Sequence, residues 1–305
     1  MGQLGYYARW YLAARLLGRL RPLQTVIFIS DRCNLRCRHC NVVQSDWRTK
    51  SYAQIEAELL RSYAKGSRIV DFEGGEPLLW RDPGTGPDGA DRNINDLIEL
   101  ARRIGYFSTT VTTNGTLPIE VKSDLVWISL DGLQEAHDDQ RGQGVFARVM
   151  AHLEASSHPN LNLNMVVTKR NFEDFVGIAT LVADHPKLRK FSYSFYVPYS
   201  DRSLMVTQEQ RDQVTTWALE LKAKGFPLMN SKAGIKLLCD PRCFYKKRQC
   251  WVSNFILADG QDLPSCPGEA AGICADCGFG MGAEMTLLWN LHPSMLRSAL
   301  AVRGA

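Results

Sequence analysis

Residues 31–41 read DRCNLRCRHCN, in which Cys33, Cys37 and Cys40 follow a run typical of a buried β-strand. In a parallel β/α fold, the loop that leaves the carboxyl end of a strand is where catalytic groups collect. Three thiolates do not complete a structural zinc site, which takes four ligands. They can hold three irons of a [4Fe–4S] cluster and leave the fourth iron open. His39 abuts Cys40, which argues against a role for it as an iron ligand.

Strand-like and helix-like segments alternate from residue 24 onward. Six β-branched or aromatic runs predict strands at Thr25–Ser30, Arg68–Glu73, Phe107–Thr113, Leu125–Leu130, Leu161–Thr168 and Lys190–Tyr196. Amphipathic stretches predict helices at Tyr52–Ala64, Ile94–Ile104, Val145–Ala155, Phe172–Ala183 and Gln208–Lys224. This alternation indicates an α/β fold with a parallel sheet and crossover helices. The pattern alone leaves an open sheet and a partial barrel as alternatives.

The chain divides into three regions by composition. Residues 24–231 carry the alternating pattern, and residues 232–305 form a Cys- and Gly-rich extension. Residues 1–23 predict an amphipathic helix in which aromatic and leucine side chains are interspersed with arginines, without a signal-peptide cleavage site. Two interpretations of this helix remain open. It either closes the bottom of the domain or lies on an anionic membrane surface.

Composition and charge exclude several classes of protein. Hydrophobic residues make up 45% of the 305 residues and charged residues 22%, which is ordinary for a globular protein. No apolar run approaches the 18 or more residues of a membrane-spanning helix. A net charge of +4 gives no reason to expect a nucleic-acid partner. The nine cysteines are odd in number and clustered, which indicates metal ligands in the reducing cytoplasm.

Four further motifs follow the predicted strands in order. They are GGEP at 74–77, TTNG at 112–115, SLDG at 129–132 and HDDQRG at 137–142. Paired glycines let backbone approach a ligand closely, and Glu76 can accept a hydrogen bond from an ammonium group. The guanidinium of Arg141 suits a carboxylate by its bidentate geometry.

Together with C-x3-C-x2-C, these motifs resemble the radical S-adenosylmethionine (SAM) superfamily over residues 24–200. The resemblance implies a partial (β/α)6 TIM-like barrel followed by a short Cys-rich extension. It implies that Cys33, Cys37 and Cys40 hold a [4Fe–4S] cluster whose open iron binds SAM. The implied SAM-binding residues are His39, Gly74, Gly75, Glu76, Asn114, Ser129, Asp131 and Arg141. The implied reaction is reductive cleavage of SAM to a 5′-deoxyadenosyl radical.

A second set of cysteines, Cys250, Cys266, Cys274 and Cys277, can complete another metal site. C-x2-C at 274–277 is compatible with zinc. The set also resembles the twitch or SPASM extension of radical SAM enzymes, which implies an auxiliary [4Fe–4S] cluster. Cys239 and Cys243 remain unassigned and could substitute as ligands. They lie in a basic stretch that is either a solvated face or a docking site for an acidic reductant such as flavodoxin or ferredoxin.

The tail CADCGFGMGAE at 274–284 and the Arg-rich amino terminus resemble hopanoid radical SAM enzymes, which attach an adenosyl group to a triterpene. This chain departs from them at Met281 and at Thr112, where they carry cysteines. The resemblance implies an apolar isoprenoid or lipid substrate and a peripheral location on the inner membrane face. Candidate pocket positions, equally explained as core, are Phe72, Phe107, Thr112, Tyr193, Phe195 and Tyr196.

Two alternatives to a lipid-modifying enzyme stay open. The first is a twitch- or SPASM-type enzyme acting on a peptide or small molecule. The barrel begins within about thirty residues of the amino terminus, which leaves no room for a peptide-recognition domain. The second is a non-catalytic iron–sulfur or zinc protein that serves electron transfer or structure. Glu76, Asp131 and Arg141 favour SAM binding over this second alternative.

Overall fold

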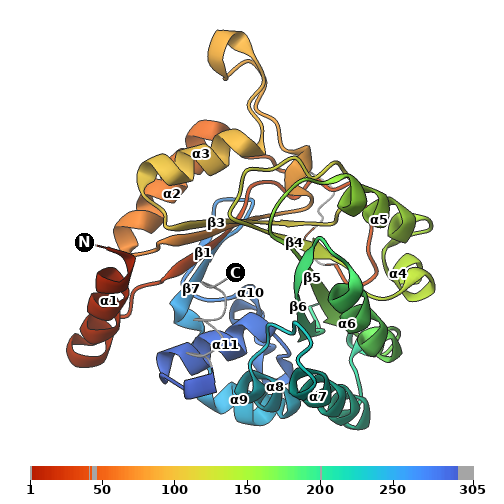
Figure 1. Ribbon diagram of the computed structural model, residues 1–305. Helices are drawn as coiled ribbons and strands as arrows, with labels where there is room; N and C mark the ends of the chain where they lie inside the picture. Colours follow the sequence, from red (N-terminus) through yellow and green to blue (C-terminus); the bar gives the residue numbers. More distant parts are fainter. Residues whose placement is uncertain (1, 41, 43–46, 200, 295–305) are drawn as a thin grey trace.

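The computed structural model describes residues 2–40, 42, 47–199 and 201–294. Within them the chain forms one eight-stranded sheet in the order β6-β5-β4-β3-β2-β1-β7-β8. The strands are β1 (Gln24–Phe28), β2 (Ile69–Glu73), β3 (Ser108–Thr113), β4 (Leu125–Ser129), β5 (Leu161–Val167), β6 (Leu188–Phe195), β7 (Ser253–Ile256) and β8 (Asp262–Leu263). Strands β1 to β7 run parallel, and β8 pairs antiparallel with β7. Figure 1 shows this sheet curving into a partial barrel.

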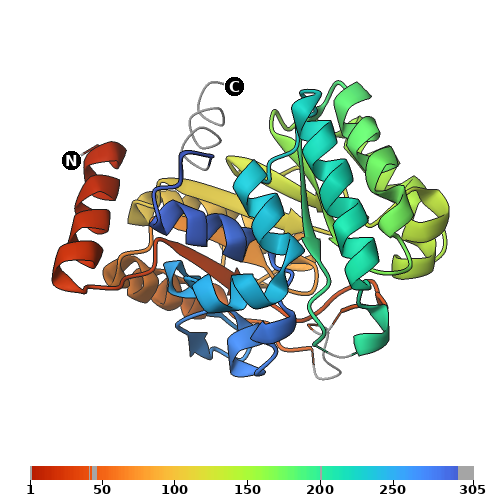
Figure 2. The same ribbon diagram turned by 90° about the horizontal axis from the view of Figure 1, so that it is seen from below.

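Helices pack around the sheet, on its outer face, at one end and across its open side (Figure 1 and Figure 2). They are α1 (Gln3–Leu17), α2 (Tyr52–Lys65), α3 (Ile94–Ile104), α4 (Gln134–Arg141), α5 (Val145–Ala155), α6 (Phe175–Asp184), α7 (Gln208–Ala223), α8 (Lys232–Cys239), α9 (Pro241–Lys247), α10 (Pro267–Ala270) and α11 (Gly280–Trp289). The main core lies between this shell and the sheet, where Phe72, Val111 and Ile128 are fully buried. Capping boxes at Ser51 and Asn93 fix the starts of α2 and α3.

The predicted α/β fold is confirmed. All six predicted strands form, with ends within two residues of the expected positions, and they make the parallel sheet of a partial barrel. The five predicted helices also form, and the predicted stretch at 172–183 begins as a short 3₁₀ turn before α6. The sequence did not predict α4 or the elements of the extension, which are α8 to α11, β7 and β8.

The Cys-rich extension closes the open side of the barrel. Its strand β7 pairs with β1, and the backbone N–H of Phe195 at the end of β6 donates to the carbonyl of Gly278 at 2.9 Å. The N–H of Gly280 donates to Ser194 Oγ at 2.9 Å. Figure 1 shows α8 to α11 lying between β7 and β6. The expected boundary at residue 232 coincides with the start of α8, but β7 joins the barrel's own sheet, so the three-region division stays a prediction.

Helix α1 lies at one end of the molecule, opposite α4 to α6 (Figure 2). Trp10 packs against Trp251 and Trp289, and its indole N–H donates to the carbonyl of Arg21 at 2.7 Å. The other side of the helix exposes leucines, among them Leu12 and Leu16. Among the described residues, none of the helices combines the length and hydrophobicity that crossing a membrane requires.

Candidate active site

A cavity of about 690 Å³ lies at the carboxyl ends of the parallel strands, inside the barrel. Ten of the predicted site residues line it, three of them cysteines from the extension. They are His39, Cys40, Gly74, Gly75, Asn114, Ser129, Arg141 and Cys266, with Cys274 and Cys277. Cys33, Cys37, Glu76, Asp131 and Cys250 are predicted site residues that do not line the cavity. The cavity therefore joins the first cysteine loop to the second cysteine set.

The first cysteine loop rests on the GGEP segment. The N–H of Gly75 donates to the carbonyl of Ser30 at 2.8 Å, and the N–H of Glu76 donates to the carbonyl of Arg32 at 2.9 Å. A Cβ atom on Gly74 would lie 2.2 Å from the carbonyl oxygen of Ser30, and one on Gly75 would lie 2.2 Å from that of Arg32. The lack of side chains at Gly74 and Gly75 thus lets their backbone approach the backbone of the cysteine loop closely. Both glycines also line the cavity.

Glu76 is almost fully buried and already hydrogen-bonded. Its carboxylate accepts from the hydroxyl of Thr113 at 2.7 Å, the N–H of Asn114 at 2.7 Å and the N–H of Leu78 at 3.0 Å. Burial raises the pKa of Glu76 above its ordinary value, and these hydrogen bonds oppose the rise. The side chain therefore ties the end of β2 to the end of β3, and its contact with the SAM ammonium stays a prediction.

Asn114 links the end of β3 to the cysteine loop. Its Nδ2 donates to Asn34 Oδ1 at 2.9 Å and to Cys33 Sγ at 3.6 Å. The Cys37 thiol interacts electrostatically with both other cysteines of the loop, and burial raises its pKa to about 11. The positive charge of Arg141 opposes that rise, as suits a site that must hold thiolates.

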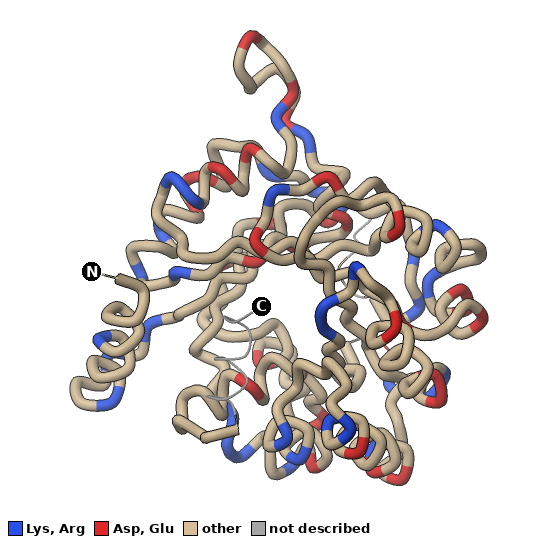
Figure 3. Tube along the Cα trace, viewed as in Figure 1, with Lys and Arg blue, Asp and Glu red and all other residues tan. Residues whose placement is uncertain are grey.

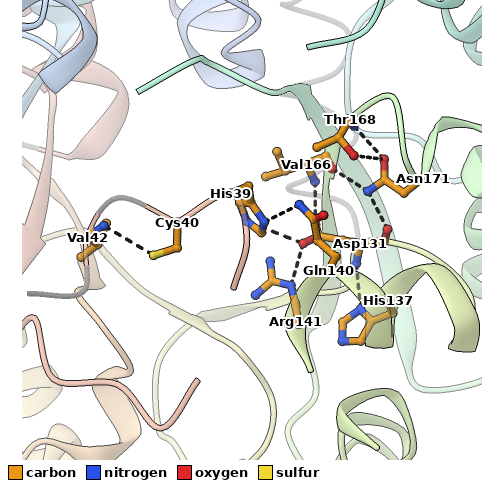
Figure 4. A network of polar contacts seen from close by, with 10 residues as sticks. All are labelled: His39, Cys40, Val42, Asp131, His137, Gln140, Arg141, Val166, Thr168 and Asn171. Carbon is orange, nitrogen blue, oxygen red and sulfur yellow. Dashed lines mark hydrogen bonds and ion pairs between the residues drawn. The ribbon is translucent and has the colours of Figure 1, made fainter. Parts of the chain in front are cut away.

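Asp131 holds Arg141 in place (Figure 4). Arg141 Nε donates to Asp131 Oδ2 at 2.6 Å, and the N–H of Val166 donates to Asp131 Oδ1 at 2.9 Å. Burial disfavours ionisation of Asp131, but the charge and the hydrogen bond of Arg141 hold the pKa of this carboxyl below its ordinary value. Asp131 thus positions Arg141, whose two Nη groups make no hydrogen bond to a described residue.

His39 joins the same network from the cysteine loop. Its Nδ1 lies 2.6 Å from Gln140 Nε2, and its Nε2 lies 3.7 Å from Asp131 Oδ2 (Figure 4). Burial lowers the pKa of His39 to about 4, so the ring is neutral at pH 7. Arg38 adds a backbone hydrogen bond to Gln140 and side-chain contacts to Asp139. Helix α4 therefore holds two successive residues of the cysteine loop, Arg38 and His39.

The second cysteine set gathers where the extension meets the cavity. A sulfur–sulfur hydrogen bond joins Cys250 to Cys266, lowering the pKa of Cys266 to about 6 and raising that of Cys250. Burial raises the pKa of Cys277 to about 12. Cys239 donates to Asp212 at 3.2 Å, and neither it nor Cys243 lines the cavity. The structure thus brings Cys250, Cys266, Cys274 and Cys277 together and places Cys239 and Cys243 apart from them, and the role of the first four as cluster ligands stays a prediction.

The residues present fit the cofactors that the sequence implies. In the described part of the chain, no three Cys, His, Asp or Glu side chains converge as they would around a single ion. A [4Fe–4S] cluster takes each thiolate at a different iron, so its ligands surround a space rather than a point. Cys33, Cys37 and Cys40 interact with one another beside the cavity, and a buried guanidinium faces them. This donor set suits a cluster with one open iron.

Of the six candidate pocket positions, three line the cavity and three do not. Thr112, Phe195 and Tyr196 lie on its wall. Phe72 and Tyr193 belong to the core, and Phe107 packs against the rings of Tyr6 and Tyr7. The sequence reasoning missed Glu73, Asn164 and Ser194, which also line the cavity. Polar residues at alternate positions of a strand, as at Asp71 and Glu73, were the signal that could have found them.

Known proteins resemble parts of this chain. The Fe-coproporphyrin III synthase of Methanosarcina barkeri is 29% identical over 222 residues, 65% of this chain and 52% of the relative. The 7-carboxy-7-deazaguanine synthase of Halobacterium salinarum is 31% identical over 137 residues, 43% of this chain and 48% of the relative. The matches thus span about half the length of these curated relatives.

Among solved structures, Streptococcus suis SuiB bound to precursor peptide SuiA superimposes with a TM-score of 0.61 at 17% identity. The superposition covers 86% of this chain and 64% of that chain, and at this identity it shows the fold alone.

The family model of the radical SAM superfamily matches residues 27–182, just over half of the chain. The matched region runs from β1 to α6 and contains the cysteine loop, the glycine pair and the Asp131–Arg141 ion pair. Members of this superfamily use a [4Fe–4S] cluster and SAM, the cofactors for which these residues are suited. The chain therefore belongs to the radical SAM superfamily.

Proposed function

We propose that this protein is a radical SAM enzyme that modifies a substrate with a largely apolar body. The observation that carries the proposal is a single cavity whose wall includes Cys40 and Arg141 as well as Cys266, Cys274 and Cys277. When bound, the reduced cluster and SAM supply a 5′-deoxyadenosyl radical by one-electron cleavage of the S–C5′ bond. A substrate in this cavity would lie between the radical source and the second cysteine set.

The chain's own residues would bind SAM and exclude water. Arg141 would pair with the SAM carboxylate through its unengaged Nη groups, because a guanidinium fits a carboxylate by two parallel hydrogen bonds. Asp131 would keep that guanidinium aimed and charged. The extension closes the barrel between β1 and β6 and would shield the radical from solvent.

The cavity chemistry supports an apolar substrate body. Phe28, Phe255, Leu257 and Phe279 contribute one continuous side of the wall from β1, β7 and the extension. An isoprenoid or lipid, as the resemblance to hopanoid enzymes implies, fits this side. The named relatives differ from one another in product, and the likeness to SuiB is one of fold, so neither selects a substrate for this chain.

We further propose that α1 contacts an anionic membrane surface. Leu4, Leu12, Leu16, Leu17 and Leu20 are more than half exposed, and Arg9 and Arg19 are exposed near them. Arg15 instead stacks its guanidinium on Trp289, 4.0 Å from the ring centroid. Charge reversal at Arg9 and Arg19 should therefore reduce flotation with anionic liposomes, and salt-insensitive or unchanged flotation would refute the proposal.

An acidic one-electron reductant such as flavodoxin or ferredoxin is the proposed partner. Five basic residues of α8 and α9 are exposed, and Figure 3 colours the Lys and Arg positions of the described residues blue. They are Lys232, Lys236, Arg242, Lys246 and Lys247. A reductant docked there would lie next to the second cysteine set, since α9 contacts the turn at Cys274–Asp276.

The proposed function is tested by metal analysis, electron paramagnetic resonance and SAM cleavage on anaerobically reconstituted protein. We expect about eight irons per chain, a reduced signal that shifts with SAM, and formation of 5′-deoxyadenosine. Cys37→Ala should abolish the shift and the cleavage. Cys274→Ala should lower iron to about four while sparing the shift, and Cys243→Ala is the matched control. Absence of any SAM-dependent change would refute the enzyme, and unchanged iron in Cys274→Ala would leave the second set to zinc or free thiols.

A further inference from the structure

The cavity has two chemically different walls. The strands β2 to β6 contribute mainly polar side chains, Glu73, Thr112, Ser129, Asn164 and Ser194, together with the apolar Val166 and Phe195, and this side is called the polar wall. The apolar wall comes from β1, β7 and the extension and presents Phe28, Phe255, Leu257, Ile273 and Phe279. A ligand that fills both sides must therefore be apolar along one part and polar at another.

Glu73 is the acidic group of the polar wall that has no compensating partner. Among the residues that the structure describes, none makes a hydrogen bond or ion pair with its carboxylate. Its electrostatic neighbour is another carboxylate, that of Asp71, which is 3% exposed and accepts from the hydroxyl of Thr112 at 3.1 Å. Glu73 itself is half-buried, and two like charges side by side in a poorly solvated site destabilise each other.

The cationic side chains of the cavity wall do not pair with Glu73. Arg141 donates to Asp131 at 2.6 Å, and Arg48 lies 3.4 Å from Asp259. Burial raises the pKa of Glu73 to about 7, and no cation opposes that rise. A carboxylate withdrawn from water without a partner is costly to a folded protein, and a ligand that brings a positive charge or an N–H donor compensates it.

We propose that Glu73 recognises the polar end of the substrate, and that this end is an amine or another cationic N–H donor attached to an apolar body. This inference rests on the proposed function, since it names the substrate class of the same cavity. SAM also carries an ammonium group, but the segment expected to bind it is 74–76 at the rim of the cysteine loop. Recognition of the substrate and recognition of SAM are thus assigned to adjacent residues at the end of β2, Glu73 for the substrate and 74–76 for SAM.

Three indoles that differ in the end group of their side chain test the proposal. Tryptamine carries an ammonium, tryptophol a hydroxyl and indole-3-acetate a carboxylate, on the same aromatic body. Binding to reconstituted protein is measured by calorimetry, with and without saturating SAM. We expect tryptamine to bind at least about tenfold more tightly than tryptophol, and indole-3-acetate more weakly than either. Saturating SAM should leave this order unchanged.

Glu73→Gln should remove the preference for tryptamine, and Glu73→Asp, which keeps the charge, should retain part of it. Glu120→Gln, at an exposed position outside the cavity, is the matched control and should behave as the wild type. A wild-type protein without preference for tryptamine, a preference that survives in Glu73→Gln, or displacement of tryptamine by SAM would each overturn the proposal.

The same samples separate this proposal from the proposed function. SAM cleavage is followed as 5′-deoxyadenosine formed after reduction, and it should persist in Glu73→Gln. If the wild type prefers tryptamine but never cleaves SAM, the radical SAM enzyme fails and the amine site stands. If SAM is cleaved but no amine preference exists, only the assignment of Glu73 fails.

Discussion

Two aspartates near helix α4 pair with arginines in very different surroundings. Asp131 pairs with Arg141 at 2.6 Å, with side chains that are 0% and 8% exposed. Asp139 pairs with Arg170 at 2.8 Å, and there the side chains are 33% and 43% exposed. Removing one partner of a buried pair leaves the other charge uncompensated, whereas an exposed pair is replaced by water. Loss of the ion pair should thus destabilise the protein more at Asp131 than at Asp139.

We therefore expect Asp131→Asn to lower the free energy of unfolding by about 3 kcal/mol at pH 7, and Asp139→Asn by less than about 1 kcal/mol. The pKa of Asp131 is held below its ordinary value, so its contribution is present above the unfolded pKa of about 4 and is lost as the pH falls through the folded pKa. Urea unfolding at pH 7 and pH 3 measures both. Equal losses in the two variants would contradict the distinction.

Ionisation of Glu73 has the opposite effect on the stability of the folded protein. Burial raises its pKa to about 7, with Asp71 beside it on the same strand, so the folded protein binds a proton that the unfolded chain releases at lower pH. The resulting penalty is absent below the unfolded pKa of about 4.3 and grows as the pH rises through the folded pKa. A residue that recognises a cation is thus retained at the expense of stability.

Glu73→Gln, which mimics the protonated acid, should accordingly be more stable than the wild type at pH 8, by about 1–3 kcal/mol, and equally stable near pH 4. Denaturant unfolding of the ligand-free protein at the two pH values measures the difference. The exposed Glu120→Gln should show no such dependence. A loss of stability at pH 8 in Glu73→Gln would mean that the carboxylate has a stabilising partner.

At the scale of elements, the glycine pair joins strand β2 to the cysteine loop. Gly75→Ala would place a Cβ 2.2 Å from the carbonyl oxygen of Arg32, and backbone must move to relieve that contact. We expect the variant to lose most of the iron held by Cys33, Cys37 and Cys40, which iron analysis and the SAM-dependent signal would show. Gly84→Ala is the control, since Gly84 has a φ of +67° but nothing within 4 Å. Full iron in Gly75→Ala would refute this packing argument.

The strands and helices that could be predicted are those whose burial leaves a pattern in the sequence. Strand β1 is buried along its whole length, and α3 has an apolar face, so both carry a clear signal. Helix α4 escaped prediction because the residues it buries are His137, Asp138, Gln140 and Arg141. A helix whose inner face is polar shows no apolar period, and its position is fixed by ion pairs and hydrogen bonds.

The residues of the site likewise divide into those that the sequence could predict and those that it could not. The cysteine loop and the glycine pair are local motifs, so their residues could be read from the sequence. Strand β7 has four residues, and its place beside β1 depends on pairing across more than two hundred positions. The contact of Gly278 with Phe195 is likewise long-range, which is why the closure of the cavity and the role of Glu73 in it could not be foreseen.

At the scale of the whole molecule, the amino-terminal helix and the carboxyl-terminal extension stabilise each other. Trp10, Trp251 and Trp289 form a cluster with ring centroids 5.0–6.4 Å apart, although they come from opposite ends of the chain. Arg15 donates to the carbonyl of Trp289 at 2.7 Å. Since α11 also packs on β6, this cluster ties α1 to the elements that close the cavity. Helix α1 is therefore structural on this side, whatever its exposed leucines contact.

Trp10→Ala should lower the free energy of unfolding by about 3–5 kcal/mol, because it removes a buried indole and its hydrogen bond to Arg21. Leu16→Ala, on the exposed side with 75% of its surface in solvent, should change it by less than about 0.5 kcal/mol. Urea unfolding of the apoprotein compares the two, and flotation with anionic liposomes reports the other side of the helix. If the helix served only as a membrane anchor, Trp10→Ala would not lower the free energy of unfolding, and both variants would float less with anionic liposomes.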